Sequence, residues 1–205
     1  MAAPAESRTV LLILAGPAGV GKSTLCDRLV AEVPGIERVI TATTRPPRPN
    51  EVNGRDYHFI SDAEFDRRLA AGDFLEWARI HQKQRSGVLK SSVLNKLDHT
   101  SLVMNIDVQG VRNVRAAAAS EPLLRNRIVT IFVAPDSFEV LRERMLGRGA
   151  ISAEELARRL QSAELEMAER YTYDYVIHSG TKEQDYRALL DYWEQAKRKA
   201  AGPVA

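Results

Sequence analysis

Hydrophobic residues gather in short continuous blocks near the start of the chain and again at three later points. Such blocks are typical of strands buried on both faces. Each is followed by a segment with apolar residues at helical spacing; in residues 23–33, Leu25, Leu29 and Val33 recur at every fourth position. Strands alternating with helices predict an α/β fold around a parallel sheet. The blocks are residues 9–15, 101–106, 127–133 and 173–178.

Polar residues mark the expected starts of three helices, since each precedes a glutamate by three positions, the spacing of a capping box. These caps are Ser61 with Glu64, Asp136 with Glu139, and Ser152 with Glu155. The last expected helix, about 182–199, carries one apolar stripe and is predicted to cover the core. The stripe consists of Tyr186, Leu189, Leu190, Trp193 and Ala196.

The stretch between the first helix and the strand at 101–106 lacks the alternation of long apolar blocks and helices. It contains Pro and Gly turns and two short helical segments. Short strand-like pieces are expected at 37–43, 56–60 and 74–80. We interpret the stretch as an insert of about 38–99 within one domain that spans 1–205. The core is then formed by about 8–37, 100–143 and 169–199.

Composition narrows the function classes. With 29 Lys and Arg against 27 Asp and Glu, the net charge of +2 gives no broad footprint for nucleic acid or an anionic membrane. The single cysteine, Cys26, excludes an intramolecular disulfide and a multi-cysteine metal site. No apolar run approaches the roughly 20 residues of a membrane span, and no signal segment is evident, so we expect a cytoplasmic protein. Arginine supplies 22 of the 29 cations, and its rigid fork suits phosphate and carboxylate groups.

A glycine-rich segment after the first strand fits the pattern G-x-x-x-x-G-K-[ST]. Glycines let successive backbone N–H groups turn around phosphate oxygens, and the start of the next helix adds its positive field. Lys22 is expected to reach the β and γ phosphates, and the Ser23 hydroxyl to bind Mg²⁺. The sequence therefore predicts a P-loop that binds ATP with Mg²⁺. Its residues are Gly16, Pro17, Ala18, Gly19, Val20, Gly21, Lys22, Ser23 and Thr24.

Two short matches raise the alternative of a GTPase. Residues 95–98 fit N-K-x-D and residues 107–110 fit D-x-x-G. In a GTPase the D-x-x-G element comes first, whereas here it follows. Residues 95–98 also lie in a helix-like segment with no strand before them. The order and the context both argue against a GTPase.

The insert carries arginines on a proline-stiffened segment, Thr43-Thr-Arg45-Pro-Pro-Arg48-Pro. A proline favours extended backbone in the residue before it, so Arg45 and Arg48 are expected to face one anion together. Tyr57, a little further along, adds a hydroxyl donor.

With these residues the chain resembles the guanylate kinases. That family carries T-T-R-x-P-R, G-x-D-Y-x-F, F-L-E-[WY]-A and D-x-Q-G in this order after a G-P-[SA]-G-[VA]-G-K loop, and all five occur here. The resemblance spans about 10–199. It implies a three-layer P-loop core with a parallel sheet, a small mixed β/α insert that binds the nucleoside monophosphate, and a helical lid at about 144–168.

The resemblance also implies an activity: a nucleoside monophosphate kinase that transfers the γ-phosphoryl group of ATP to GMP or dGMP. Arg45, Arg48 and Tyr57 would bind the acceptor phosphate, and Glu76 and Asp107 the guanine N1–H and 2-amino groups. Thr41 and Gly87 fall at further acceptor positions. Mg²⁺ would be bound by Ser23, with waters held by Asn105 or Asp107. The residues expected to act on the transferred group are Lys22, Arg144, Arg148 and Arg159.

Three positions depart from the family pattern. Where relatives read G-N-Y-Y-G-[TS], this chain has Ser86 in place of a tyrosine and Val88 in place of a hydroxyl residue. Arg85 is a candidate for a replacement phosphate contact. Asn105 stands where relatives carry the first Asp of D-x-D-x-Q-G, which removes a charge near the expected metal.

These departures leave two alternatives beside a guanylate kinase. One is a kinase of the same fold acting on a different phosphate monoester, although the retention of Glu76 and Asp107 argues for guanine. The other is a non-catalytic module that binds a phosphorylated ligand, although its phosphate loop would then typically be degraded. We expect small-molecule nucleotides as partners, and the oligomeric state, monomer or homodimer, stays open.

Overall fold

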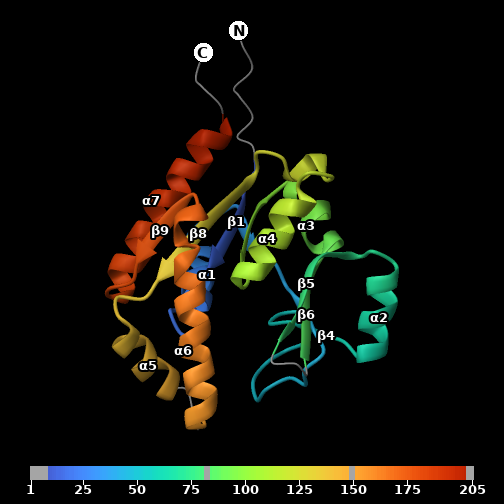
Figure 1. The fold of residues 1–205 in the computed structure, drawn as a ribbon. Helices are drawn as coiled ribbons and strands as arrows, with labels where there is room; N and C mark the ends of the chain where they lie inside the picture. The colour runs from blue at the N-terminus through green and yellow to red at the C-terminus, as the bar shows by residue number, and fades with distance from the viewer. Residues whose placement is uncertain (1–8, 81–83, 148–150, 202–205) are drawn as a thin grey trace.

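The computed structural model describes residues 9–80, 84–147 and 151–201. Its larger sheet has five parallel strands at the centre of the molecule (Figure 1). The predicted parallel α/β sheet is confirmed. In spatial order the strands are β2 (Ile36–Arg38), β7 (Ser101–Asn105), β1 (Leu11–Ala15), β8 (Ile128–Ala134) and β9 (Tyr175–His178).

The residues of β1 are all fully buried because helices cover both faces of the sheet. Leu12 and Leu14 pack in one core with the helices α1 (Lys22–Glu32) and α7 (Lys182–Ala201). Leu11, Ile13 and Ala15 pack in another with α3 (Lys90–Leu97) and α4 (Val108–Ala117). A strand between two apolar layers needs the continuous run seen in its sequence.

Capping was predicted correctly for two of the three helices. Ser61 accepts a hydrogen bond from the Glu64 N–H, and Ser152 from the Glu155 N–H. The Asp136 cap is wrong, because α5 (Phe138–Leu146) begins one residue later and Ser137 accepts from the Val140 N–H. Asp136 and Ser137 are adjacent and either can act as an N-cap, so the sequence does not decide at which residue the helix begins.

The helix after Ser152 is α6 (Ala153–Ala168), and 3₁₀ turns lie at Pro122–Leu124 and Arg170–Thr172.

A second, mixed sheet follows β2. The predicted strand at 37–43 is wrong as one element, because it divides between the core sheet and the second sheet. The strand β6 was not predicted; its sequence, with a central glycine and mixed polarity, lacks a clear period of two. In spatial order the second sheet contains β4 (His58–Phe59), β3 (Ala42–Thr43), β6 (Gln84–Leu89) and β5 (Phe74–Ile80).

The helix α2 (Asp62–Ala70) covers the second sheet, and Phe65 stacks on Phe74 there at 4.3 Å between ring centroids. The start of α4 packs against β5 and joins the two sheets. In Figure 1 the second sheet and α2 accordingly lie to one side of α4, away from α6 and α7.

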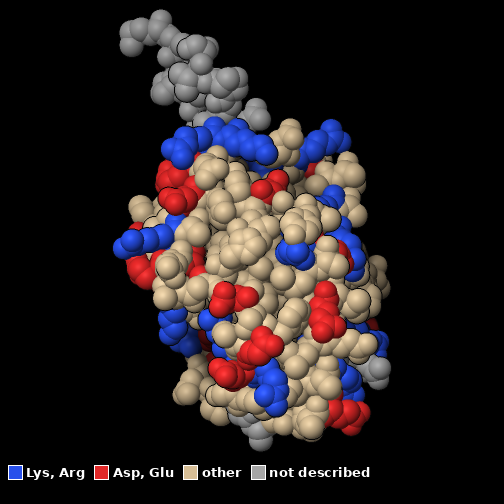
Figure 2. Space-filling model, turned by 60° about the vertical axis from the view of Figure 1, so that its left-hand side comes forward, with Lys and Arg blue, Asp and Glu red and all other residues tan. Residues whose placement is uncertain are grey.

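Charged side chains of both signs are interspersed over the face turned forward in Figure 2. This fits the small net charge of +2. Within the described ranges, no helix is long and apolar enough to cross a membrane. Residues 95–97 lie in the last turn of α3, as expected for a segment that does not read guanine in the manner of a GTPase.

Candidate active site

The glycine-rich segment forms the turn between β1 and α1. Gly16, Gly19 and Gly21 have φ angles of 131°, 102° and 101°, a region that favours glycine. A Cβ on Gly16 would lie 2.3 Å from the Val133 carbonyl oxygen, so only glycine lets the loop pass this close to β8. The loop is therefore fixed by both its own conformation and the neighbouring strand.

Lys22 spans this loop. Its Nζ donates to the Gly16 and Pro17 carbonyl oxygens at 2.6 and 3.0 Å. The residue at the N-cap of α1 is Gly21, which supplies no side-chain hydrogen bond to the helix. The first N–H groups of α1 and the Lys22 ammonium thus meet at one place, a suitable arrangement for an anion.

Two cavities flank the loop. The first reaches from the loop to the second sheet; its lining includes Gly16, Lys22, Thr41, Tyr57, Glu76 and Asp107. The second lies toward α5 and α7; its lining includes Gly19, Gly21, Thr24, Arg28, Arg144 and Asp185. The loop forms part of the wall of both.

Glu76 places a buried carboxyl group in the first cavity. It is 7% exposed on β5. Its pKa is raised to about 8, mainly by burial and also by the Asp107 charge, while a hydrogen bond from the Val88 backbone opposes the shift. Its neighbour Asp107 caps α4, and its Oδ1 accepts from the Gly110 N–H at 2.6 Å. A Cβ on Gly110 would lie 3.1 Å from Glu76 Oε2, so this glycine gives the two acids room.

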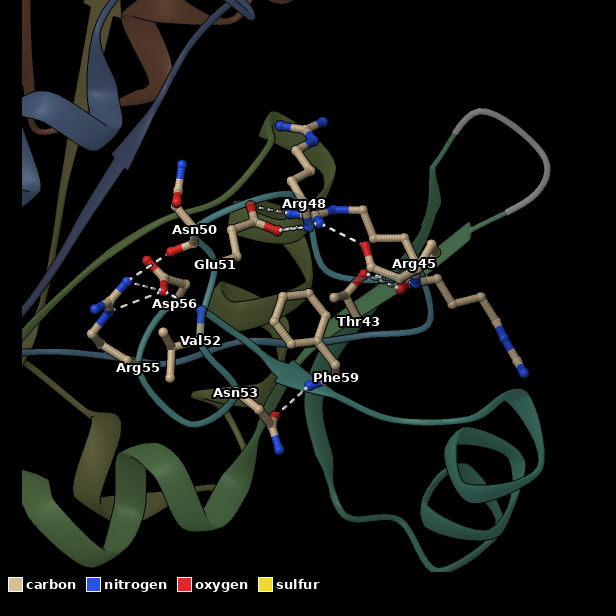
Figure 3. A network of polar contacts seen from close by, with 12 residues as sticks. Thr43, Arg45, Arg48, Asn50, Glu51, Val52, Asn53, Arg55, Asp56 and Phe59 are labelled. Carbon is tan, nitrogen blue, oxygen red and sulfur yellow. Dashed lines mark hydrogen bonds and ion pairs between the residues drawn. The ribbon is translucent and has the colours of Figure 1, made fainter.

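The Arg45 guanidinium and the backbone N–H of Arg48 both contact the carboxylate of Glu51 (Figure 3). Arg45 donates to both oxygens of Glu51 at 2.6 and 2.7 Å, and the backbone N–H of Arg48 donates at 2.7 Å. These contacts lower the pKa of Glu51 to about 2, and the hydrogen bonds from Arg45 make the largest contribution. The Arg45 guanidinium also lies over the Tyr57 ring, 4.7 Å from its centroid. Arg45 is thus held in place, whereas the side chain of Arg48 is exposed.

Comparison with known proteins identifies the family of the chain. The sequence model of the guanylate kinase family matches residues 8–196. The guanylate kinase of Bifidobacterium longum is 41% identical over 89% of this chain and 91% of its own, and that of Symbiobacterium thermophilum is 41% identical over 85% and 79%. The solved guanylate kinase from Anaplasma phagocytophilum superposes with a TM-score of 0.73 at 26% identity, over 96% of this chain and 90% of that one. The chain belongs to the guanylate kinase family.

The arginines expected to act on the transferred group in this guanylate kinase lie in different surroundings. Arg144, on α5, lines the second cavity and donates to Ser179 Oγ at 3.3 Å. Arg159, on α6, forms an ion pair with Glu155 at 2.8 Å and is not among the described residues that line either cavity. Arg148 lies outside the described residues.

The segment that departs from the family pattern has clear structural roles. Gly87 is closely packed: a Cβ there would lie 2.7 Å from Phe74 and 2.8 Å from the Glu76 carbonyl oxygen. Val88 is fully buried, and Ser86 donates to the Ala42 carbonyl oxygen at 3.1 Å. Arg85 does not reach toward the phosphate loop; it forms ion pairs with Asp62 and Asp66 of α2. Two acids in the first turns of α2 account for this placement of Arg85.

Three further residues at the candidate site were not predicted from the sequence. They are Arg38 and Glu166, which line the first cavity, and Glu51. Burial raises the pKa of Glu166, with the positive charge of Lys22 acting against the shift. Glu51 follows the arginine segment directly, so its charge was an available signal. Arg38 and Glu166 are brought to the first cavity only by the tertiary fold, and no local sequence pattern marks them.

Proposed function

We propose that this guanylate kinase transfers the γ-phosphoryl group of ATP to GMP, giving ADP and GDP. The observation that carries the proposal is the pair of cavities on either side of one phosphate loop, the first of which contains the buried Glu76 carboxyl beside Asp107. A donor nucleotide in one cavity and an acceptor in the other would direct their phosphates toward Lys22. Phosphoryl transfer depends mainly on such positioning and on charge stabilisation.

Glu76 is the residue proposed to select guanine. Its ionised carboxylate has two acceptor oxygens, which match the N1–H and 2-amino donors of guanine. Adenine has an unprotonated N1 and no 2-amino group, so it would leave the buried acceptor without these donors. Unpaired buried polar groups give strong discrimination between ligands.

The acceptor phosphate is assigned to Arg48, Tyr57 and the remaining N–H groups of Arg45. Glu51 takes both ends of the Arg45 fork and so fixes this side chain before any ligand binds. A preorganised cation loses little side-chain entropy when it meets a phosphate. Thr41, which lines the same cavity, is proposed to contact the acceptor nucleotide.

The donor triphosphate is assigned to residues 16–24, with Arg144 at the edge of the second cavity. The Ser23 hydroxyl and the phosphate oxygens form an all-oxygen donor set that fits Mg²⁺. When bound, the ion would supply charge neutralisation between the donor phosphates. Lys22 can move from the loop carbonyls to a phosphate oxygen with only a change in its own side chain.

One panel tests the proposed function. Purified protein is supplied with ATP, Mg²⁺ and either GMP, dGMP, IMP, AMP or UMP, and ADP release is followed. We expect turnover with GMP and dGMP, weaker turnover with IMP, which lacks the 2-amino group, and little with AMP or UMP. Equal turnover with AMP and GMP would contradict the assignment of Glu76.

A second panel separates the two arginines. Arg48→Ala is expected to raise the KM for GMP at least tenfold while the KM for ATP changes less than twofold. Arg45→Ala should show the same direction and also lose the contacts with Glu51. An equal rise in both KM values for Arg48→Ala would show that it does not hold the acceptor phosphate.

A further inference from the structure

Arg38 occupies a place in the first cavity that the assignments above do not use. It ends β2, and Asn105 ends the neighbouring parallel strand β7, so both side chains emerge at the carboxyl edge of the sheet beside the phosphate loop. This edge is where open parallel sheets bind their ligands. Both residues line the first cavity together with Lys22.

The contacts of Arg38 determine how Asn105 is oriented. The Arg38 guanidinium forms an ion pair with Asp27 of α1, and its Nη2 donates to Asn105 Oδ1 at 2.9 Å. A guanidinium has donors only, so it must face the amide oxygen of Asn105 and not its NH₂ group. The NH₂ group is thereby turned toward Ser23, with 3.4 Å between Asn105 Nδ2 and Ser23 Oγ.

The charges of the cavity give Arg38 a second effect. Among the described residues that line it, the carboxyl groups of Asp56, Glu76, Asp107 and Glu166 are accompanied by two cations, Lys22 and Arg38. A phosphoryl group entering this space needs positive charge to offset these acids. Arg38 is then the second cation of the cavity wall.

We propose that Arg38 is a positioning residue for phosphoryl transfer, which holds Asn105 with its amide N–H toward Ser23 and adds positive charge where the phosphates meet. This inference rests on the proposed function, because it assigns the first cavity to the acceptor. It gives Asn105 the role of a hydrogen-bond donor at the loop.

A double-mutant cycle tests whether Arg38 acts through Asn105. The variants are Arg38→Met, which keeps the aliphatic stem, Asn105→Ala and the two combined. We expect each single variant to lower kcat at least tenfold with less than a threefold change in the KM for GMP. Because Arg38→Met removes both the contact with Asn105 and the charge, the double variant should be little worse than Arg38→Met alone. Losses that multiply in the double variant would overturn the positioning role.

Two further variants separate function from folding. Arg38→Lys keeps the charge and loses the fork, and should recover part of kcat. Arg67→Met removes an exposed, ion-paired arginine of α2 and should keep kcat within twofold. A melting temperature that falls in Arg38→Met while kcat stays within twofold of the wild type would show a structural role only.

A second test measures ATP binding by calorimetry in EDTA, and this measurement does not require GMP to be phosphorylated. In the proposed arrangement the γ-phosphate of ATP meets the acceptor at the loop, beside the first cavity that Arg38 lines. Without metal this phosphate depends on the cations of the protein, so Arg38→Met should weaken ATP binding at least fivefold and Arg67→Met should not. Unchanged ATP affinity in Arg38→Met would overturn the charge role. If the wild type binds ATP but phosphorylates no nucleotide, the proposed function fails, and this comparison still decides the role of Arg38.

Discussion

The Glu76 carboxyl is needed in its ionised form for the proposed recognition of guanine, but its surroundings favour the neutral form. Burial and the neighbouring Asp107 raise its pKa to about 8. In the unfolded chain the same carboxyl has a pKa of about 4.5. Between these two values the folded protein holds a proton that the unfolded chain has released, so Glu76 makes stability fall as pH rises.

Replacing Glu76 with Gln is expected to stabilise the protein at high pH. At pH 9 the variant avoids a buried charge and should gain on the order of a few kcal/mol in free energy of unfolding. Below about pH 4.5 the two proteins should be alike, because Glu76 is neutral in both states of the wild type. Urea unfolding at pH 5, 7 and 9 measures this, and a gain that does not grow with pH would show that the pKa of Glu76 is not raised.

GMP affinity should rise with pH for the same reason. Binding through the ionised carboxylate requires loss of the proton that Glu76 holds below about pH 8. We therefore expect the Kd for GMP to fall between pH 6 and pH 8 and to level off above, with proton release seen by calorimetry in buffers of different ionisation enthalpy. Glu76→Gln serves as the control and should show weak binding without this pH dependence.

At the scale of elements, Gly87 sets how closely β6 approaches β5. A Cβ at this position would meet both the Phe74 ring and the Glu76 carbonyl oxygen below 3.0 Å, and the backbone atom cannot move without shifting β5. Gly87→Ala should cost about 1–3 kcal/mol of stability. It should also raise the KM for GMP, because Glu76 lies on the displaced strand.

Gly147 provides a matched control. It ends α5 with φ of −68°, and a Cβ there would meet only ordinary contacts at 3.5 Å and beyond. Gly147→Ala should leave stability unchanged or raise it by up to about 1 kcal/mol. Denaturant unfolding of both variants checks the pair; similar losses in both would show that close packing is not what Gly87 provides.

Sequence predicted the elements whose causes are local. Leu12 and its neighbours form an apolar run that suits only a doubly covered strand, and the loop at 16–23 fixes a strand before it and a helix after it. The sequence did not predict β6 because its residues are determined by tertiary contacts and not by a local pattern. Val88 is buried in the core, and Ser86 donates to the Ala42 carbonyl oxygen on the neighbouring strand. Arg85 was misjudged for the same reason, since Asp62 and Asp66 reach it only after α2 packs on the sheet.

At the scale of the whole molecule, the candidate site is assembled from two sheets joined through the start of α4. Asp107 caps this helix and lies beside Glu76 of the second sheet, so the first cavity, proposed to bind the acceptor, depends on both parts. The second cavity, proposed to bind the donor, depends on the loop, α5 and α7. Each nucleotide should therefore stabilise a different part of the chain.

Hydrogen exchange can separate these parts. GMP is expected to slow exchange in the second sheet, residues 42–43, 74–80 and 84–89, and in the first turn of α4. ATP with Mg²⁺ should slow it in residues 16–25 and in α5. Protection of the same segments by both nucleotides would contradict the assignment of one cavity to each.

The glycine at the start of α1 has a consequence for folding as well as for binding. Ser61, Ser137 and Ser152 each complete their helix with a hydroxyl oxygen, whereas Gly21 offers none. A phosphate oxygen bound at this point would accept hydrogen bonds from the first N–H groups of α1, as the serine hydroxyls do in the other helices. Bound as proposed, the triphosphate would act as the N-cap of α1, and part of its binding free energy would come from stabilising the first turn of this helix.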